Sequence, residues 1–244
     1  MRILLVILLG LGLAGCSTVL PTQPRPQPTL QPAPQVTPTT ALPSAREAAD
    51  NFVAVLDRVE PVAERICRAE APGLACDYQI VVDSRVEMPP NAFQTVDEAG
   101  RPIIAFTIAL VAEARNQDEL AFILGHEAAH HIAGHLPRQR DSAVRGAVLA
   151  GVLASLGGGD AQAIETAQRV GASVGARAYS KDFELEADAL GTIIAYRAGY
   201  DPIVGAQYFA RIEDPGNRFL GTHPPNASRI ETVRRTVAQL QAGG

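Results

Sequence analysis

Residues 125–135 read Gly125-His126-Glu127-Ala128-Ala129-His130-His131-Ile132-Ala133-Gly134-His135 and contain four of the chain's five histidines. Within them, His126-Glu127-x-x-His130 places two imidazoles one helical turn apart, a spacing at which both can bind one Zn²⁺ ion. The carboxylate between them is placed to act as a general base on water. The stretch therefore predicts the active-site helix of a zinc peptidase.

The residues before the motif favour a helix. Asn116 can cap its N-terminus, and two acidic residues occupy the first turn, where the helix dipole favours negative charge. Apolar residues then recur at helical spacing. The acidic residues are Asp118 and Glu119, and the apolar ones are Leu120, Leu124 and Ile132.

Helical geometry separates the histidines into two pairs. At about 100° per residue, His126 and His130 project within about 40° of each other, with Glu127 only about 60° further round. His131 and His135 project about 140° away. We therefore expect the second pair to face elsewhere and not to join the same metal.

The motif needs a third protein ligand. A histidine ten positions after the first would complete H-E-x-x-H-x-x-G-x-x-H, but Leu136 stands there and Ala133 takes the glycine position. The other route is a carboxylate from a later helix, for which Asp182 is a candidate cap. Glu184 in that helix would complete a two-histidine, one-glutamate site with its fourth position open.

Asp188 lies one helical turn after Glu184, on the same face. We expect it to hydrogen-bond a ligand imidazole and so fix its tautomer. An ordinary solvated helix charge is the alternative for both residues. For Glu186, which projects elsewhere, that alternative is the favoured one.

The N-terminus has the features of a secretory signal. One early cation, Arg2, precedes an apolar run of about a dozen residues, whereas a membrane span needs about 20. Leu13-Ala14-Gly15-Cys16 resembles the bacterial lipobox. We therefore expect residues 1–15 to be a lipoprotein signal peptide and Cys16 to be lipidated; an ordinary signal peptide with an incidental cysteine is the alternative. Ser17 resembles lipoproteins sent to the outer membrane.

Residues 16–43 are expected to form a tether. Residues 21–43 contain eight prolines, and Arg25 is their only charged residue. Such a composition cannot build a core and favours an extended, semi-rigid spacer that holds a folded domain off the membrane. Residues 44–244 remain as one domain.

Charge argues against a nucleic-acid partner. Removal of residues 1–15 deletes one arginine and no acid, which leaves 20 basic against 26 acidic residues with Lys181 as the single lysine. Cys67 and Cys76 are expected to form a disulfide in an oxidising periplasm, with free buried thiols as the alternative.

The sequence around the motif predicts further elements. Ser44, with Glu47 three residues on, begins a helix that Pro61 is expected to kink or restart. Residues 78–83 and 102–107 are expected to be strands. The second strand either pairs with extended substrate as an edge strand or is an ordinary core strand.

Residues 143–177 are rich in small and apolar residues, with Gly157-Gly158-Gly159 as a break and Gly171-x-x-x-Gly175 beyond it. The first run is too short to span a bilayer, so tight helix packing is favoured. A mobile lid or membrane-touching hairpin over the cleft is the alternative.

Several segments, taken together, resemble the CAAX prenyl endopeptidase/HtpX family of gluzincin metallopeptidases. The resemblance implies a zincin-like α+β domain, mainly helical with a small β-sheet beside the active-site helix. It implies one zinc ion per chain, bound by His126, His130 and Glu184. The segments are Asn91-Ala92-Phe93, Asp118-Glu119-Leu120-Ala121, His126-Glu127-x-x-His130 with His135, Phe183-Glu184-x-Glu186-Ala187-Asp188, Ala198-Gly199-Tyr200-Asp201-Pro202, and Thr222-His223-Pro224-Pro225 with Arg229.

The same resemblance implies that His223 approaches the zinc, either to stabilise the oxyanion or to occupy the open position at rest. Arg229 would brace that loop or the site. Because the chain lacks the transmembrane helices of the integral family members and a helical repeat domain, it resembles the periplasmic lipoprotein branch.

These features together predict a lipid-anchored zinc metalloendopeptidase of the bacterial cell envelope, with its domain in the periplasm. We expect Glu127 to take a proton from water and return it to the leaving amine. The expected substrates are misfolded or unassembled envelope proteins. One rival function is a zinc-bearing, chaperone-like assembly lipoprotein with little proteolysis; another is a purely structural envelope tether.

Overall fold

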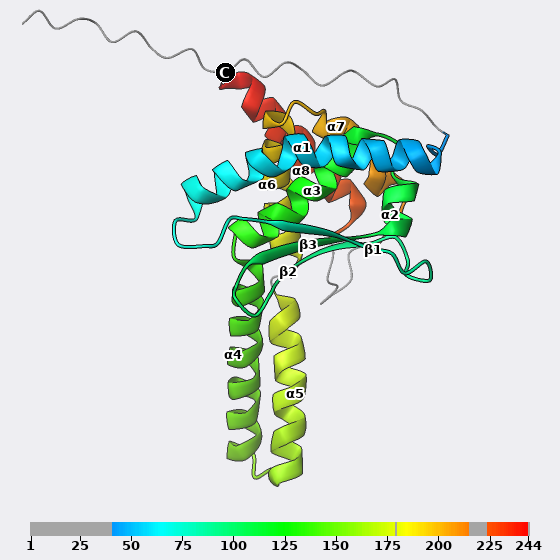
Figure 1. Ribbon diagram of the computed structural model, residues 1–244. Helices are drawn as coiled ribbons and strands as arrows, with labels where there is room; N and C mark the ends of the chain where they lie inside the picture. The colour runs from blue at the N-terminus through cyan, green and yellow to red at the C-terminus, as the bar shows by residue number, and fades with distance from the viewer. Residues whose placement is uncertain (1–40, 179, 215–223, 244) are drawn as a thin grey trace, which may run out of the picture.

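The computed structural model describes residues 41–178, 180–214 and 224–243, and α3 (Gln117–Ile132) lies at the centre of the fold (Figure 1). Every residue of α3 from Glu119 to Ala129 is buried. A helix so completely enclosed holds its side chains in fixed directions, which suits a helix that carries the predicted motif.

The other elements surround this helix in an α+β arrangement that is mainly helical, as predicted. In chain order they are α1 (Ala45–Glu70), β1 (Gln79–Asp83), β2 (Ala92–Val96), β3 (Pro102–Thr107), α2 (Ile108–Glu113), α4 (His135–Leu156), α5 (Ala161–Ala178), α6 (Ser180–Arg197), α7 (Pro202–Gly205), the 3₁₀-helix η1 (Ala206–Ala210) and α8 (Asn226–Ala242).

α1 begins with the predicted capping box. The Ser44 hydroxyl accepts a hydrogen bond from the Glu47 backbone N–H, and the Glu47 carboxylate accepts one from the Ser44 backbone N–H. The helix continues through Pro61, so the expected restart there is wrong. A disulfide joins Cys67, near the C-terminal end of α1, to Cys76 before β1, as predicted.

The sheet has three strands in the order β1-β3-β2. β3 pairs in parallel with β1 and antiparallel with β2, and its Ile104 and Phe106 are buried. The predicted strand 102–107 is therefore the central one, so its possible role as an edge strand is wrong and the core alternative holds. The edge strand beside α3 is β2, which was not predicted.

α3 and α6 approach closely through two glycines. A Cβ atom on Gly125 would lie 2.8 Å from the Gly191 carbonyl oxygen, and one on Gly191 would lie 2.7 Å from the His126 nitrogen. Only residues without a Cβ allow backbones this near each other. This contact places the first turns of α6 beside the histidines of α3.

α4 and α5 form an antiparallel hairpin that extends away from the rest of the domain (Figure 1). Their backbones touch at Gly146 and Gly171, where a Cβ on either residue would lie within 2.2 Å of the other's carbonyl oxygen. The predicted tight helix packing is therefore present. Among the hairpin residues, only those near its base, such as Leu136 and Gln139, line the cleft.

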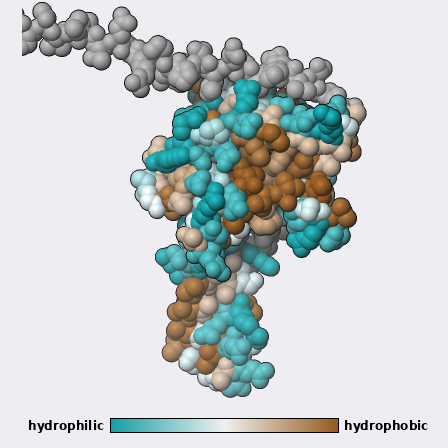
Figure 2. All heavy atoms as spheres, viewed as in Figure 1, coloured by the Kyte–Doolittle hydropathy of each residue, from teal (hydrophilic) through white to brown (hydrophobic). Residues whose placement is uncertain are grey.

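Apolar side chains follow the α4 side of this hairpin (Figure 2). Val148, Leu149 and Leu153 are more than half exposed. Within the described part of the chain, no helix has both the length and the apolar character needed to cross a bilayer.

Candidate active site

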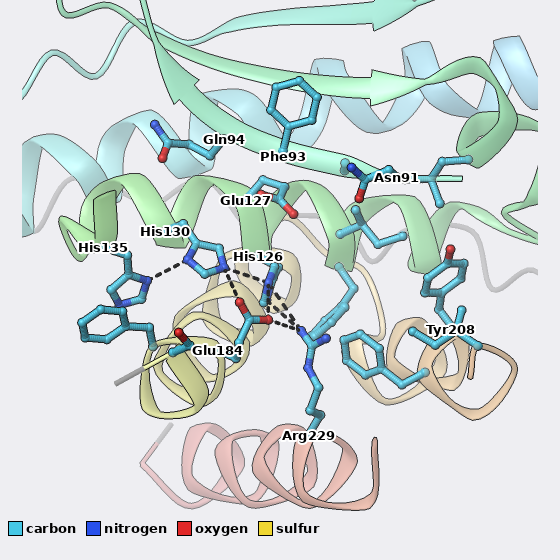
Figure 3. Close-up of a pocket in the computed structure, with 18 of the residues that line it drawn as sticks. Asn91, Phe93, Gln94, His126, Glu127, His130, His135, Glu184, Tyr208 and Arg229 are labelled. Atoms are coloured by element: carbon cyan, nitrogen blue, oxygen red, sulfur yellow. Dashed lines mark hydrogen bonds and ion pairs between the residues drawn. The ribbon is translucent and has the colours of Figure 1, made fainter. Parts of the chain in front are cut away.

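His126 and His130 from α3 converge with Glu184 from α6 (Figure 3). The two Nε2 atoms are 3.0 Å apart. Glu184 Oε1 lies 3.4 Å from His130 Nε2, and its Oε2 lies 3.6 Å from His126 Nε2. One ligand atom from each residue thus falls within 4.8 Å of the others, so the three could hold a metal ion.

The spacing of these atoms fits zinc. Tetrahedral ligands about 2.0–2.1 Å from a zinc ion lie about 3.3 Å from one another, which is close to the three separations observed. Each imidazole also has a partner at Nδ1, the Asp188 carboxylate for His126 and the His135 ring for His130, so both Nε2 atoms are left to face a shared ion. The donor set of two imidazoles and a carboxylate is one that zinc favours.

Asp188 fixes the orientation of His126. Its Oδ1 lies 2.9 Å from His126 Nδ1, and the side chain is fully buried. Arg229 from α8 donates to both Asp188 oxygens, from Nη2 to Oδ1 at 2.7 Å and from Nε to Oδ2 at 2.8 Å. Burial opposes ionisation of Asp188, but the hydrogen bonds from Arg229 and His126 outweigh it and lower its pKa.

The two histidines differ in their protonation equilibria. Burial lowers the pKa of His130 to about 3, so its imidazole is neutral, as a metal ligand must be. Burial is the largest influence on His126 and acts against its charge, but the hydrogen bond to Asp188 and the charges of Asp188 and Glu184 together outweigh it and raise the pKa of His126. The environment of His126 thus favours positive charge, which either a proton or a metal ion can supply.

Glu127 is buried, lines the cleft, and lies between the histidines and β2 (Figure 3). Burial raises the pKa of its carboxyl group above the ordinary value, although His126 acts in the opposite direction. A raised pKa makes the carboxylate a stronger proton acceptor, which is the property that a general base requires.

The cleft in front of these residues has a volume of about 650 Å³. One wall is β2, which contributes Ala92, Phe93 and Gln94. The opposite end is largely apolar, and its lining includes Leu110, Phe122, Ile123, Tyr208, Phe209 and Ile212. The cleft therefore joins a polar centre to an apolar recess.

The expectation that His135 faces away from the site is wrong. Its Nδ1 lies 2.8 Å from His130 Nδ1. α3 ends at Ile132, and Gly134 has a φ of +64°, so His135 starts a new helix and the projection of about 100° per residue does not apply to it. His131 does point elsewhere, with its Nε2 2.7 Å from the Ala75 carbonyl oxygen.

Glu186 is about half exposed, as expected of a solvated helix charge, and it also lies 3.2 Å from His135 Nε2 and 2.9 Å from Arg138 Nη1. α6 begins at Ser180, so Asp182 falls in its first turn and is not its cap. Arg229 lies within the site beside His126. His223, Cys16 and the predicted signal peptide 1–15 lie outside the described residues, as does nearly all of the tether 16–43.

β2 is the main feature of the site that sequence reasoning missed. Ala92-Phe93-Gln94-Thr95-Val96 contains β-favouring residues, and a turn at Asp97–Gly100 leads back into β3. The run is short, and only the hydrogen-bonded pairing with β3 defines it.

Comparisons with known proteins agree with this geometry. The chain is 28% identical over 146 residues to the beta-barrel assembly-enhancing protease of Yersinia pestis, covering 54% of this chain and 30% of that protein. It is 26% identical over 146 residues to the protein of that name from Escherichia coli K12, with the same coverage. It is 30% identical over 173 residues to the mitochondrial metalloendopeptidase OMA1 of Saccharomyces cerevisiae, covering 67% of this chain and 47% of OMA1.

The chain thus spans about a third to a half of the length of these relatives. The sequence model of peptidase family M48 matches residues 54–237, which include α3, β2, α6 and most of α8. That match extends over most of the chain and contains the converging histidines and glutamate. The chain belongs to peptidase family M48, a family of zinc metallopeptidases.

Proposed function

We propose that this protein is a zinc metalloendopeptidase of the gluzincin type, anchored by lipid at Cys16 with its domain in the periplasm. Its substrates would be misfolded or unassembled envelope proteins. The observation that carries the proposal is the convergence of His126, His130 and Glu184 beside the buried carboxylate of Glu127. The names of the bacterial relatives, beta-barrel assembly-enhancing proteases, support the envelope setting.

In this proposal, His126, His130 and Glu184 hold one zinc ion. The ion would polarise the scissile carbonyl and lower the pKa of water at the site. Glu127 takes the proton of the attacking water, a role that its raised pKa favours, and passes it to the leaving amine. Asp188 and Arg229 keep the His126 ring oriented through their paired hydrogen bonds.

Substrate would bind in extended form along β2. This strand is at the edge of the sheet, and residues 90–94 line the cleft. Main-chain pairing at an edge strand binds many sequences, because it uses groups that every peptide has. The apolar recess formed by residues such as Phe122 and Phe209 would favour a bulky apolar side chain near the scissile bond. Both properties suit unfolded proteins as substrates.

Glu127→Gln tests the catalytic role. The amide keeps the shape of the side chain but cannot accept the proton, so we expect cleavage of an unfolded protein such as casein to fall at least about 100-fold. Zinc content, measured by elemental analysis, should stay at the wild-type level. Glu165→Gln, on the exposed surface of α5, is the matched control and should change neither quantity. Retained hydrolysis by Glu127→Gln would refute the role.

The same variant separates proteolysis from a chaperone-like function, which the words "assembly-enhancing" in the relatives' names bring into consideration. If the protein assists assembly without cutting, cells that carry Glu127→Gln should assemble outer-membrane proteins as wild type does. If it acts by cleavage, uncut envelope proteins should accumulate on the variant.

A further inference from the structure

We infer that His135 and Glu186 are positioning residues that hold His130 in its metal-binding tautomer. The inference rests on the proposed zinc site and assigns a task to two residues that the mechanism above does not use. Neither residue is offered as a ligand: His135 meets the His130 ring at Nδ1, on the side away from Glu184 (Figure 3), and Glu186 contacts His135.

The contacts form a chain that leads away from His130. His130 Nδ1 lies 2.8 Å from His135 Nδ1, and His135 Nε2 lies 3.2 Å from Glu186 Oε2. Arg138, one turn further along α4, donates to the same Glu186 oxygen at 2.9 Å. The His135 ring is only 4% exposed and stacks on Phe183, with ring centroids 4.6 Å apart and planes inclined by 10°. Its orientation is therefore restrained on several sides.

The carboxylate determines where the protons lie. Ionised Glu186 can only accept hydrogen bonds, so His135 must carry its proton on Nε2 and leave Nδ1 as an acceptor. His130 must then donate from Nδ1, which leaves its Nε2 lone pair directed at His126 and Glu184. In the opposite arrangement, a proton on His130 Nε2 would block the metal, and a His135 lone pair would face the carboxylate. For a neutral His135, the metal-binding arrangement satisfies the contacts to His130 and Glu186, and the opposite arrangement does not.

His126 provides a parallel case within the same site. It meets the Asp188 carboxylate directly, whereas His130 meets the Glu186 carboxylate through one intervening imidazole. Hydrogen bonds from ligand histidines to such partners commonly improve metal affinity 10- to 100-fold. In α6, Glu184 would thus serve as a ligand, while Asp188 and Glu186 each support one of the two histidines.

Two substitutions at His135 test the inference in the full chain. His135→Phe preserves the ring that stacks on Phe183 but removes the acceptor, so we expect zinc affinity, measured by competition with a chromophoric chelator, to fall about 10- to 100-fold. His135→Asn places an amide oxygen near the position of Nδ1 and should restore most of that loss. Thermal unfolding of the metal-free variants reports any separate effect on stability.

Glu186→Gln should weaken zinc binding less than His135→Phe, because its side chain is 48% exposed. Asp182→Asn, an exposed carboxylate in the same helix, is the matched control and should leave affinity unchanged. In long-range ¹H–¹⁵N spectra of the zinc-loaded protein, we expect a proton on Nδ1 of His130 and on Nε2 of His135.

Zinc affinity of His135→Phe within twofold of wild type would overturn the inference. The inference would also be overturned if His135→Phe and His135→Asn lost zinc affinity equally and both were less stable in the metal-free form. That pattern would mark a merely structural role for His135. Failure of the proposed function is distinguishable: without the zinc site, wild-type protein itself would bind no zinc, and without peptidase activity, wild-type protein would bind zinc but leave casein uncut.

Discussion

At the scale of single residues, three carboxylates of α6 differ in how far they are buried and in which side chains they contact. Glu184 faces the Nε2 atoms of the two α3 histidines, Asp188 is fully buried against Arg229, and Glu186 is half exposed against His135. These three residues are every second position of one helix, and all are carboxylates. Their different burial and contacts therefore come from the elements that surround the helix.

Glu184→Gln tests the third ligand. A neutral amide is a much poorer ligand for zinc than a carboxylate, so we expect zinc affinity to fall by more than the 10- to 100-fold typical of a lost supporting hydrogen bond. Chelator competition measures this loss. Circular dichroism should show an unchanged helical fold, and a variant that binds zinc as tightly as wild type would remove Glu184 from the site.

Asp188→Asn tests the buried ion pair. The substitution leaves the Arg229 guanidinium without its charged partner, and breaking a buried pair in this way typically costs about 3–5 kcal/mol. We expect urea unfolding of the metal-free protein to shift to lower denaturant concentration by a corresponding amount. Asp141→Asn, an exposed position beyond the first turn of α4, should unfold at the wild-type midpoint.

At the scale of elements, the contact between α3 and α6 positions the site. The two helices meet at Gly125, which precedes His126 in α3, and at Gly191, which lies less than two turns after Glu184 in α6. A change at this contact moves one ligand-bearing helix relative to the other. We therefore expect stability and metal binding to be coupled through Gly125 and Gly191, although neither contributes a ligand atom.

Gly191→Ala is expected to separate the helices. The added Cβ would lie 2.7 Å from the His126 nitrogen, and overpacking of this kind typically costs about 1–3 kcal/mol. We expect a lower thermal midpoint together with weaker zinc binding. Gly157→Ala, at the hairpin tip, has its nearest contacts at 3.4 Å or more and is the control. Wild-type zinc affinity in Gly191→Ala would show that the close approach is not needed.

At the scale of the whole molecule, the proposal places a compact peptidase domain on a lipid tether. The domain carries the M48 match, and the predicted anchor and tether precede it. A long Pro-rich spacer would let the cleft reach unfolded chains some distance from the membrane. The hairpin of α4 and α5 extends the domain beyond the cleft and leaves apolar side chains exposed on α4 (Figure 2).

Cys16→Ser tests the anchor. Without the thiol there is no site for the lipid, and the acyl chains that contribute about 0.8 kcal/mol per buried CH₂ are lost. We expect the protein to move from the detergent phase to the aqueous phase in Triton X-114 partition, while the purified protein keeps its zinc content. Detergent partition equal to wild type would contradict lipidation at Cys16.

Much of the fold was predictable from sequence because the relevant signals are local. The capping box of Ser44, the strand 102–107 and the Cys67–Cys76 disulfide all appear in the structure. The 126/130 spacing alone implies that two imidazoles share a helical face, since it depends only on the 3.6-residue turn. The same residue types predict zinc as the metal.

Tertiary structure alone decided the rest. The edge position of β2 depends on which strands pair, and the contact between His135 and His130 depends on the left-handed turn at Gly134. The position of Glu186 depends on how α6 packs against both α3 and α4. Helical projection from a sequence assumes one uninterrupted helix, so it fails where the chain turns. Contacts between elements are set by packing, which local periodicity does not encode.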